Sequence, residues 1–370
     1  MSNAKKGNIG KSNIKKGGIK KYLNKVFIDG LSGMALGLFS TLIIGTIIQQ
    51  IAGFIDGSIG DTLHLIGKAA TIVTGAGIGC GVAYKFKESP LVVLSAATAG
   101  MVGAYAAKIL DGKFLLDNGV VQLIGPGEPL GAFVAAYVGI ELGHLISGKT
   151  KLDIILTPMV SILSGSIAGL LIGPPISSFM ARLGDIIEFG TKQQPFLMGI
   201  IVSVLMGIIL TLPISSAAIS LALGLSGLSA GAATVGCCAN MIGFAVASFR
   251  ENKVGGLMAQ GIGTSMLQVP NIYKKPIIWL PAIISSAILG PLSTMVFKMT
   301  NNPTGSGMGT SGLVGQIMTF QTMTTTESFI IVFLKVALLH FILPAVFSLV
   351  ISEYMRRKNW IKLGDMKLAL

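Results

Sequence analysis

This sequence has little charge for its length. Only 12% of its 370 residues are Asp, Glu, Lys or Arg, whereas 52% are hydrophobic, and the mean hydropathy is +0.77. About a quarter of the residues are charged in an average soluble domain, so the composition argues against a soluble enzyme. Long apolar runs recur from residue 26 to residue 351. At ~20 residues for each crossing, they predict an all-α polytopic membrane protein with about eight to ten transmembrane helices.

Residues for independent catalysis or metal binding are also scarce. The sequence has 3 cysteines and 3 histidines, and no HExxH or CxxC pattern joins them. Cys80, Cys237 and Cys238 all lie in apolar segments, which is typical of reduced core cysteines. We therefore expect no catalytic residue, no metal and no cofactor.

Acidic residues are outnumbered, 15 against 28 basic ones, and the net charge of +13 is concentrated at the two ends. Eight lysines and no acid precede Val26, and the tail from Glu353 holds five basic residues against two acids. Because Lys and Arg beside spans stay in the cytoplasm, both termini are predicted to be cytoplasmic. We expect a disordered basic arm over 1–24, one transmembrane domain over 25–352 and a basic tail over 353–370. These ends set the topology or touch anionic lipid, and we do not expect nucleic-acid binding.

The stretch Leu123–Gly131, LIGPGEPLG, interrupts an apolar run and carries an acid. Its two prolines and three glycines disfavour a continuous helix, and Glu128 is one of only two acids between Asp117 and Lys149. A broken backbone at membrane depth is tolerated where it lines protein or water. An intramembrane carboxylate is a candidate functional residue, so Glu128 is the leading site residue. The alternative is an interfacial turn with an exposed Glu.

Two further interruptions contain no charge, at Gln260–Asn271 and Asn301–Gln316. They predict re-entrant or broken hairpins. Amides and hydroxyls suit a neutral polyhydroxylated solute, whereas an anion site would want Arg or Lys. The candidate solute-binding residues here are Gln260, Thr264, Gln268, Asn271, Asn301, Asn302, Ser306, Thr310, Ser311 and Gln316. The alternative is an extended external loop with a Gly-rich packing motif.

A further break is predicted at Gly173–Pro175, where it would end the span 154–172. Amphipathic, interfacial helices are expected over 55–68 and 176–189, because charged and apolar residues alternate there.

Three residues are candidate proton or hydrogen-bond partners: Glu141, His144 and His340. Glu141 and His144 are three residues apart and share a helix face. They form either a buried couple or the end of a span near Lys149, and the span end is favoured. His340 is the one histidine in its apolar run. A buried structural histidine is the commoner explanation, but this residue is also the natural partner for an intramembrane acid.

Several of these segments together resemble a known family. They are Gly125–Gly131, Gly261–Asn271, Asn301–Gln316, Trp279-Leu280-Pro281 and Gly290-Pro291. As a set they resemble the membrane (IIC) subunit of the bacterial phosphoenolpyruvate-dependent sugar phosphotransferase system, and more closely its PfoR-type branch, often labelled a toxin regulator. The resemblance covers about residues 20–351. Glu128-Pro129 matches the Glu-Pro turn of the sugar family, although it lies earlier in the chain, and no histidine falls inside a matching hairpin.

The resemblance implies a homodimer in the bacterial plasma membrane whose mobile domain carries a sugar to a soluble IIB protein. The leading hypothesis is therefore a IIC-type transporter of a small neutral polar solute, with any phosphorylation by a separate IIB protein. Glu128 would accept hydrogen bonds from solute hydroxyls or carry a coupling proton. The alternatives are an ion- or proton-coupled secondary transporter without phosphotransfer, and a non-transporting membrane sensor or regulator.

Overall fold

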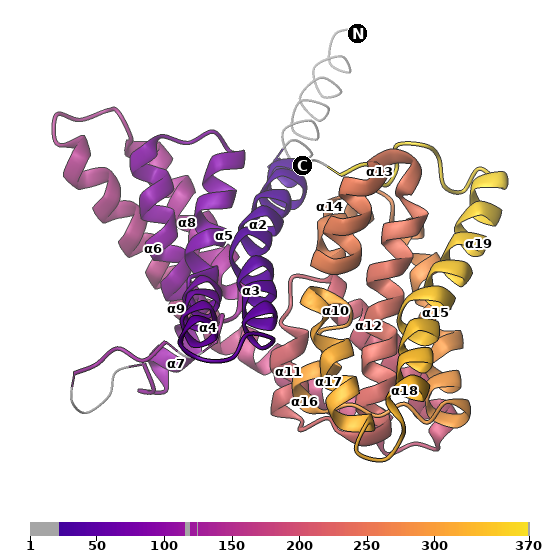
Figure 1. Ribbon diagram of the computed structural model, residues 1–370. Helices are drawn as coiled ribbons and strands as arrows, with labels where there is room; N and C mark the ends of the chain where they lie inside the picture. The colour runs from indigo at the N-terminus through magenta and orange to yellow at the C-terminus, as the bar shows by residue number, and fades with distance from the viewer. Residues whose placement is uncertain (1–21, 115–118, 124, 369–370) are drawn as a thin grey trace, which may run out of the picture.

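The apolar runs fold into helices that lie side by side in two groups (Figure 1). The computed structural model describes residues 22–114, 119–123 and 125–368, so most of the predicted basic arm and Ile124 lie outside the described residues.

Short π or 3-10 turns are labelled η. The first group contains η1 (Lys25–Gly30), α2 (Leu31–Leu38), η2 (Phe39–Ile43), α3 (Ile44–Ala52), α4 (Ser58–Ile72), α5 (Thr74–Lys85), α6 (Pro90–Ala104), α7 (Ala106–Leu110) and α8 (Pro129–Ile146). The second contains α10 (Pro195–Thr211), α11 (Ser216–Ala222), α12 (Gly227–Ala247), α13 (Phe249–Met258), η3 (Ala259–Gly263), η4 (Ser265–Gln268), α14 (Val269–Lys274), η5 (Pro276–Trp279), α15 (Leu280–Pro291), η6 (Leu292–Val296), α16 (Pro303–Ser306), η7 (Ser311–Leu313), α17 (Val314–Met323), α18 (Phe329–Val336), η8 (Ala337–Ile342) and α19 (Leu343–Arg357).

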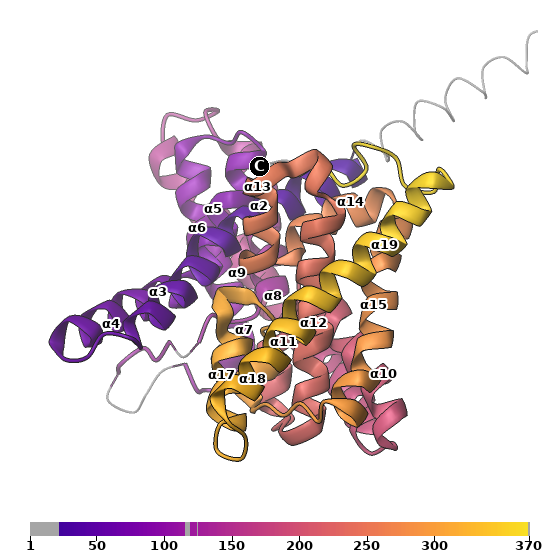
Figure 2. The same cartoon turned by 45° about the vertical axis from the view of Figure 1, so that its right-hand side comes forward.

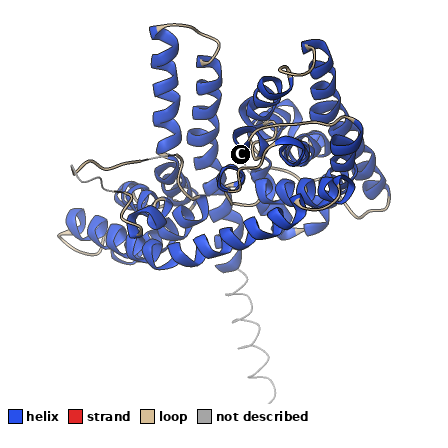
Figure 3. Cartoon of the chain, turned by 90° about the horizontal axis from the view of Figure 1, so that it is seen from below, coloured by secondary structure: helices blue, strands red, loops and turns tan. Residues whose placement is uncertain are grey.

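The expected all-α polytopic fold is confirmed: the described residues form helices and loops with no strand (Figure 3). Six helical stretches among them are long and apolar enough to cross a membrane. These are Tyr22–Ala52, Pro129–Ile146, Asp153–Thr191, Gly227–Ala247, Pro276–Val296 and Phe329–Arg357. The pair α4 and α5, bent by 53°, adds a seventh crossing if it counts as one span. The expected eight to ten are reached only when the shorter apolar helices α6 and α10 are included as well.

The helix α9 (Asp153–Thr191) connects the two groups and contradicts one expectation. It runs unbroken through 39 residues, with Pro174 and Pro175 inside it, although the sequence predicted a break at Gly173–Pro175. It packs against α6 and α8 of the first group and against α10 and α11 of the second. A proline removes one N–H from the helix ladder, but the surrounding protein can satisfy the freed carbonyl in a membrane helix. The amphipathic segment expected over 176–189 is therefore the later part of α9.

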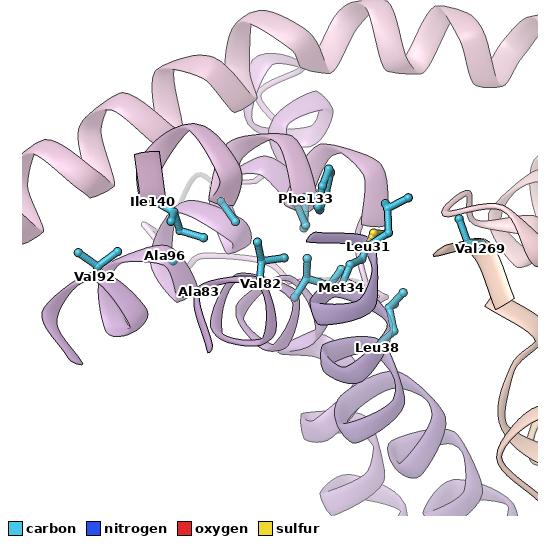
Figure 4. Close-up of a cluster of buried hydrophobic side chains, with 14 of the residues drawn as sticks. Leu31, Met34, Leu38, Val82, Ala83, Val92, Ala96, Phe133, Ile140 and Val269 are labelled. Carbon is cyan, nitrogen blue, oxygen red and sulfur yellow. The ribbon is translucent and has the colours of Figure 1, made fainter. Parts of the chain in front are cut away.

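A buried apolar cluster holds the first group together and reaches the second (Figure 4). Met34 on α2 and Val82 on α5 belong to it, and Val269 joins it from the start of α14. Glycine lets α2 and α5 approach this closely, because a Cβ atom on Gly37 would lie 2.2 Å from the carbonyl oxygen of Gly77. The first group therefore packs backbone against backbone, as small residues allow in membrane bundles.

The second group is built around α12, most of whose residues are buried. The Asn240 amide, fully buried on this helix, donates to Ser286 Oγ at 3.1 Å and accepts from Trp279 Nε1 at 2.9 Å. Beside it, α10 and α15 meet at two glycines, where a Cβ on Gly290 would lie 2.0 Å from the Gly199 carbonyl oxygen. The hydrogen-bonded Asn240 amide and the glycine contacts between α10 and α15 therefore hold the centre of this group together.

The helices α3 and α4 form an arm that projects from the rest of the molecule (Figure 2). Only three residues of α4 are buried. Asp61, His64 and Lys68 are exposed, and their spacing places them along one face of the helix. The amphipathic helix expected over 55–68 is thus found as α4.

The described chain begins and ends on the same face of the molecule, which is drawn at the top of Figure 1 and is called the upper face here. Side-chain contacts tie several loops to it. Lys25 Nζ lies 2.6 Å from Glu141 Oε1, and His144 Nδ1 lies 2.8 Å from Glu88 Oε2. The start of the chain therefore shares this face with the loops that follow α5 and α8.

The glycine contact between α10 and α15 predicts that Gly290→Ala destabilises the protein. The new methyl group would press on the Gly199 backbone, which cannot move aside as a flexible side chain can, and overpacking of this kind costs about 1–3 kcal/mol. We expect a lower thermal unfolding midpoint in detergent. Gly255→Ala is the matched control, because nothing lies within 4 Å of a Cβ there. An unchanged midpoint for Gly290→Ala would contradict the packing.

Candidate functional site

The two uncharged interruptions fold into hairpins on opposite sides of the molecule (Figure 1). The upper hairpin is 249–274, formed by α13, η3, η4 and α14, and it lies toward the upper face. The lower hairpin is 301–323, formed by α16, η7 and α17, and it lies toward the opposite face. Each one turns back inside the molecule instead of crossing it, as expected for a re-entrant segment.

The tips of the two hairpins meet in the interior, at the boundary between the two groups. The Thr310 hydroxyl of the lower tip donates to the Gly261 carbonyl of the upper one. The upper tip also touches the first group, since a Cβ on Gly263 would lie 2.4 Å from the Phe39 ring. In the lower tip, Gly312 has φ +53° and lies against α3. Glycine is needed there because other residues rarely adopt this backbone conformation.

Beside the lower tip lies a buried group of polar atoms with unused hydrogen-bonding capacity. Gln316 Nε2 is 3.1 Å from His340 Nδ1 and 3.4 Å from Cys238 Sγ. Gln316 Oε1, His340 Nε2 and Ser311 Oγ are buried without a partner. With this amide orientation the glutamine offers an acceptor and the histidine a donor, and rotating the amide reverses both. A hydroxyl, which donates and accepts, satisfies either arrangement.

The other candidates of the lower hairpin hold its backbone in place. Asn301 Nδ2 donates to Thr234 Oγ1 at 2.8 Å and to Thr319 Oγ1 at 3.0 Å, and its Oδ1 accepts from the Asn302 N–H. The Asn302 side chain caps the first turn of α16, and the Ser306 hydroxyl donates within that turn. These three side chains already have protein partners.

The candidates of the upper hairpin also bond within the protein. Gln268 Nε2 donates to Gln260 Oε1 at 2.8 Å, and Asn271 Nδ2 donates to Gln268 Oε1 at 2.9 Å. Gln268 and Asn271 additionally bind the backbone of the C-terminal tail at Met366 and Lys367. The remaining candidate, Thr264, caps the next turn through its hydroxyl. The structure therefore places Gln268 and Asn271 at the tail, away from the lower tip.

Glu128 lies at the start of α8, in a turn fixed by the first group. Its N–H donates to the Ala104 carbonyl at 2.8 Å. Gly127 has φ +74°, and a Cβ there would lie 2.7 Å from the Ala104 side chain. The Tyr105 hydroxyl donates to the Gly125 carbonyl. The sequence GPGEP thus gives a tight turn that presents the Glu128 carboxyl group toward α11.

The Glu128 turn borders a cavity of about 740 Å³ between the two groups. Its walls come from α7, the turn, α9 and α11, and they are mostly alanine, isoleucine, leucine and methionine side chains. The backbone N–H groups of Leu130 and Ser215 donate to the Glu128 carboxylate, while its Oε1 atom is buried without a partner. Lys108 and Asp185 also line the cavity. Glu128 therefore faces a cavity, but the two uncharged hairpins do not line that cavity.

Glu141 and His144 lie near the upper face, paired with Lys25 and Glu88. His340 lies far from both in the fold, on η8 of the second group and beside Gln316. The three candidate proton partners therefore do not form one cluster.

Two stretches fit the spacing of catalytic motifs. Gly143–Thr150 matches the GxxxxGK[ST] pattern of phosphate-binding loops, and Gly227–Gly231 matches GxSxG. Both motifs require a preceding strand, whereas the first stretch here spans the end of α8 and its loop and the second opens α12. The Gly148 N–H that would bind a phosphate donates to Asp153 instead. No group of three or more His, Cys, Asp or Glu that could hold a metal occurs within the described residues.

These features define a polytopic helical membrane protein with opposed re-entrant hairpins, an arrangement found in membrane transporters. The chain belongs to the family described as phosphotransferase system, EIIC, whose family model matches residues 28–368. It is therefore a membrane transporter of the phosphotransferase-system type. No match to the chain is found among curated proteins.

The Asn301 bonds predict a structural role for this residue. Asn301→Ala would leave the Asn302 N–H without its acceptor and take a donor from the Thr234 and Thr319 hydroxyls, which keep their bonds to the Ala230 and Gly315 carbonyls. We expect these losses to cost about 1–3 kcal/mol. We expect thermal unfolding in detergent at a lower temperature. Asn302→Ala removes only a helix cap, so its effect should be smaller, about 1 kcal/mol. Equal effects of the two substitutions would contradict the assignment.

Proposed function

We propose that the protein carries a small neutral polar solute, with sugars the leading class, through the interior where the hairpin tips meet. The observation that supports this is the buried, uncharged group of Gln316, His340 and Ser311, which has unpartnered donors and acceptors. A carrier must bind its solute in a place that can open toward either face, and hairpin tips from opposite sides provide such a place. The solute hydroxyls would replace the missing hydrogen bonds.

Glu128 is proposed to meet the solute at the adjoining cavity. Its unpartnered Oε1 is an acceptor for a hydroxyl, and the cavity lies between the two groups that would move relative to each other. The cavity walls are mostly apolar, and Glu128, Ser215, Lys108 and Asp185 are the polar residues that line it. A hydrogen bond to a carboxylate is stronger than one between neutral groups.

A second candidate, proton-coupled transport without phosphotransfer, is favoured by one observation. The Glu128 Oε1 atom is buried without a partner. Such a carboxyl oxygen can hold a proton without losing a hydrogen bond. Solute that accumulates unmodified in vesicles lacking any IIB protein would support this candidate. Solute that is released only as a phosphate ester, and only with a IIB protein present, would support the phosphotransferase mechanism.

The upper face is proposed to be cytoplasmic and to receive the IIB protein. Basic residues gather in the segments of this face and would keep it inside the cell by the Lys/Arg bias. They include Lys85, Lys87, Lys149, Lys151, Arg250, Lys253, Lys274, Lys275, Arg357 and Lys358. We extend the proposal to a bacterial plasma membrane and to the PfoR-type branch, which the segments quoted above resemble.

A homodimer is proposed in which the projecting arms pair. α4 and α5 form a bent pair that is apolar enough to cross a membrane, and Asp61 and Lys68 would be costly if they were exposed to lipid. In a two-fold dimer the same surface meets itself. An antiparallel contact of two α4 helices would place each Asp61 opposite the partner copy's Lys68, with His64 near the axis.

The role of Glu128 predicts that Glu128→Gln lowers uptake by about tenfold to a hundredfold. This is the effect expected when the solute loses one hydrogen bond to a charged acceptor. Uptake of labelled neutral sugars by vesicles is the measurement, with Gln316→Met as a second variant that should also lose uptake. Glu188→Gln is the control, because Glu188 is an exposed acid paired with Lys192. Wild-type uptake by Glu128→Gln across pH 5 to 8 would remove Glu128 from the mechanism.

The arm contact predicts cross-linking between copies. A chain carrying both Asp61→Cys and Lys68→Cys should form a covalent dimer on mild oxidation in membranes. The cysteine at position 61 of one copy would face the cysteine at position 68 of the other across the two-fold axis. Each single substitution should stay monomeric, which makes the singles matched controls. Monomer from the double variant, or dimer from either single variant, would contradict this pairing.

A further inference from the structure

The C-terminal tail does not leave the protein after its last helix. α19 ends at Arg357, and residues 359–368, called the strap here, run back over the upper hairpin. Ile361 and Met366 are buried, with 2% and 0% of their surface exposed, in an apolar cluster with Ile272 and Ile278. Leu363 between them is 74% exposed. The strap thus inserts two apolar side chains, while Lys362, Leu363 and Lys367 are exposed.

The upper hairpin binds the main chain of the strap through three amide side chains. Asn252 Nδ2 and Gln268 Nε2 donate to the Met366 carbonyl at 2.8 and 2.9 Å. Asn271 Nδ2 donates to the Lys367 carbonyl at 2.9 Å, and Asn252 Oδ1 accepts from the Leu368 N–H at 2.9 Å. These amides come from both limbs of the hairpin, α13 and α14, so the strap joins the two limbs.

Ion pairs flank this contact. Lys275 Nζ lies 2.6 Å from Asp365 Oδ2. Arg356 Nη2 lies 3.0 Å from Glu251 Oε1, with both side chains nearly buried, and the same oxygen accepts from the Gly364 N–H at 3.3 Å. Charged side chains therefore hold residues 364 and 365 of the strap, and neutral amides hold residues 366–368 beside them.

The upper hairpin in turn braces the first group. Val269 belongs to the apolar cluster of that group (Figure 4), and the Tyr273 ring stacks on Phe27 with centroids 4.8 Å apart. The hairpin thus lies between the strap and the first group. A movement of the hairpin away from the first group must break the contacts of Val269 and Tyr273.

We propose that residues 359–368 are a detachable strap that locks the upper hairpin and keeps the path from the upper face closed. The proposal deepens the transport function proposed above and rests on it for its purpose, although the locking itself is independent of any solute. Release of the strap would free Asn252, Gln268 and Asn271 to bond with water and leave the hairpin held by the first group and by α10 and α12. A hairpin without the strap would open more often.

The Asp365 carboxyl group makes the strap stable across ordinary pH. Burial raises its pKa, but bonds from Lys275 and the Lys362 N–H, with the charges of Lys275 and Arg356, outweigh burial and lower the pKa below 3.8. A carboxyl group with a lowered pKa stabilises the bound state above its ordinary pKa and loses this contribution as pH falls through the lowered value. We expect the strap to stay bound from pH 8 to pH 5 and to loosen only in stronger acid.

Met366→Asp tests the strap, because it places a charge at a fully buried position without changing the hairpin. Two readouts are measured in the full chain in inside-out vesicles. Trypsin cleavage after Lys362 reports release of the strap. Labelling of Ser265→Cys, at the buried hairpin tip, by a membrane-impermeant maleimide reports opening, with the three native cysteines replaced. We expect both rates to rise about tenfold or more, as when several buried hydrogen bonds are lost together.

Leu363→Asp is the matched control for labelling, since it adds the same charge to the same segment at an exposed position and should not change the labelling rate. Its cleavage rate is not compared, because an acid directly after Lys362 slows trypsin itself. A chain that ends at Lys358 is the second variant and should label as fast as Met366→Asp. Faster cleavage without faster labelling, or slow labelling of the shortened chain, would overturn the proposal. Because neither readout uses a solute, loss of uptake in Glu128→Gln with normal labelling would be a separate result about the transport site.

Discussion

Backbone that leaves the helix inside a membrane protein must find its hydrogen-bond partners within the protein, and the structure depends on this constraint. The lower hairpin meets it with Asn301, whose amide accepts from the Asn302 N–H and donates to the Gly315 carbonyl. The upper hairpin meets it with Gln260, which donates to the Gly256 carbonyl, and Gln268 and Asn271 extend this chain of amides. Neutral amides can do this at a smaller desolvation cost than carboxylates, which explains why the interrupted segments are polar but uncharged.

The same constraint separates supporting residues from those available to a solute. An amide whose donors and acceptors are all bonded cannot accept a ligand without losing a bond. Gln316, His340 and Ser311 keep unpartnered atoms beside the point where the Thr310 hydroxyl meets the Gly261 carbonyl. The boundary between the two helix groups passes through this point. A carrier built from two rigid groups would move along such a boundary, and the glycine contacts within each group keep the groups themselves rigid.

Much of the fold could be predicted from the sequence, because apolar runs and charge-poor breaks are local signals. The spans, the re-entrant hairpins and the amphipathic helix at 58–72 follow from them. The continuity of α9 through Pro174 and Pro175 could not be predicted, since it depends on neighbouring helices. The roles of the candidate site residues were harder to predict than the fold. Gln268 and Gln316 look alike in sequence, but one meets the strap at Met366 and the other meets His340.

The most direct test of the account is whether the two hairpins enter from opposite sides. Val254→Cys on the upper hairpin and Thr325→Cys beyond the lower one are both exposed positions. Each is introduced singly into a chain without its native cysteines and treated with an impermeant maleimide, first in intact cells and then in inside-out vesicles. The account predicts that Thr325→Cys labels only in cells and Val254→Cys only in vesicles. Labelling of both positions from the same side would contradict opposed hairpins and the transport site between their tips.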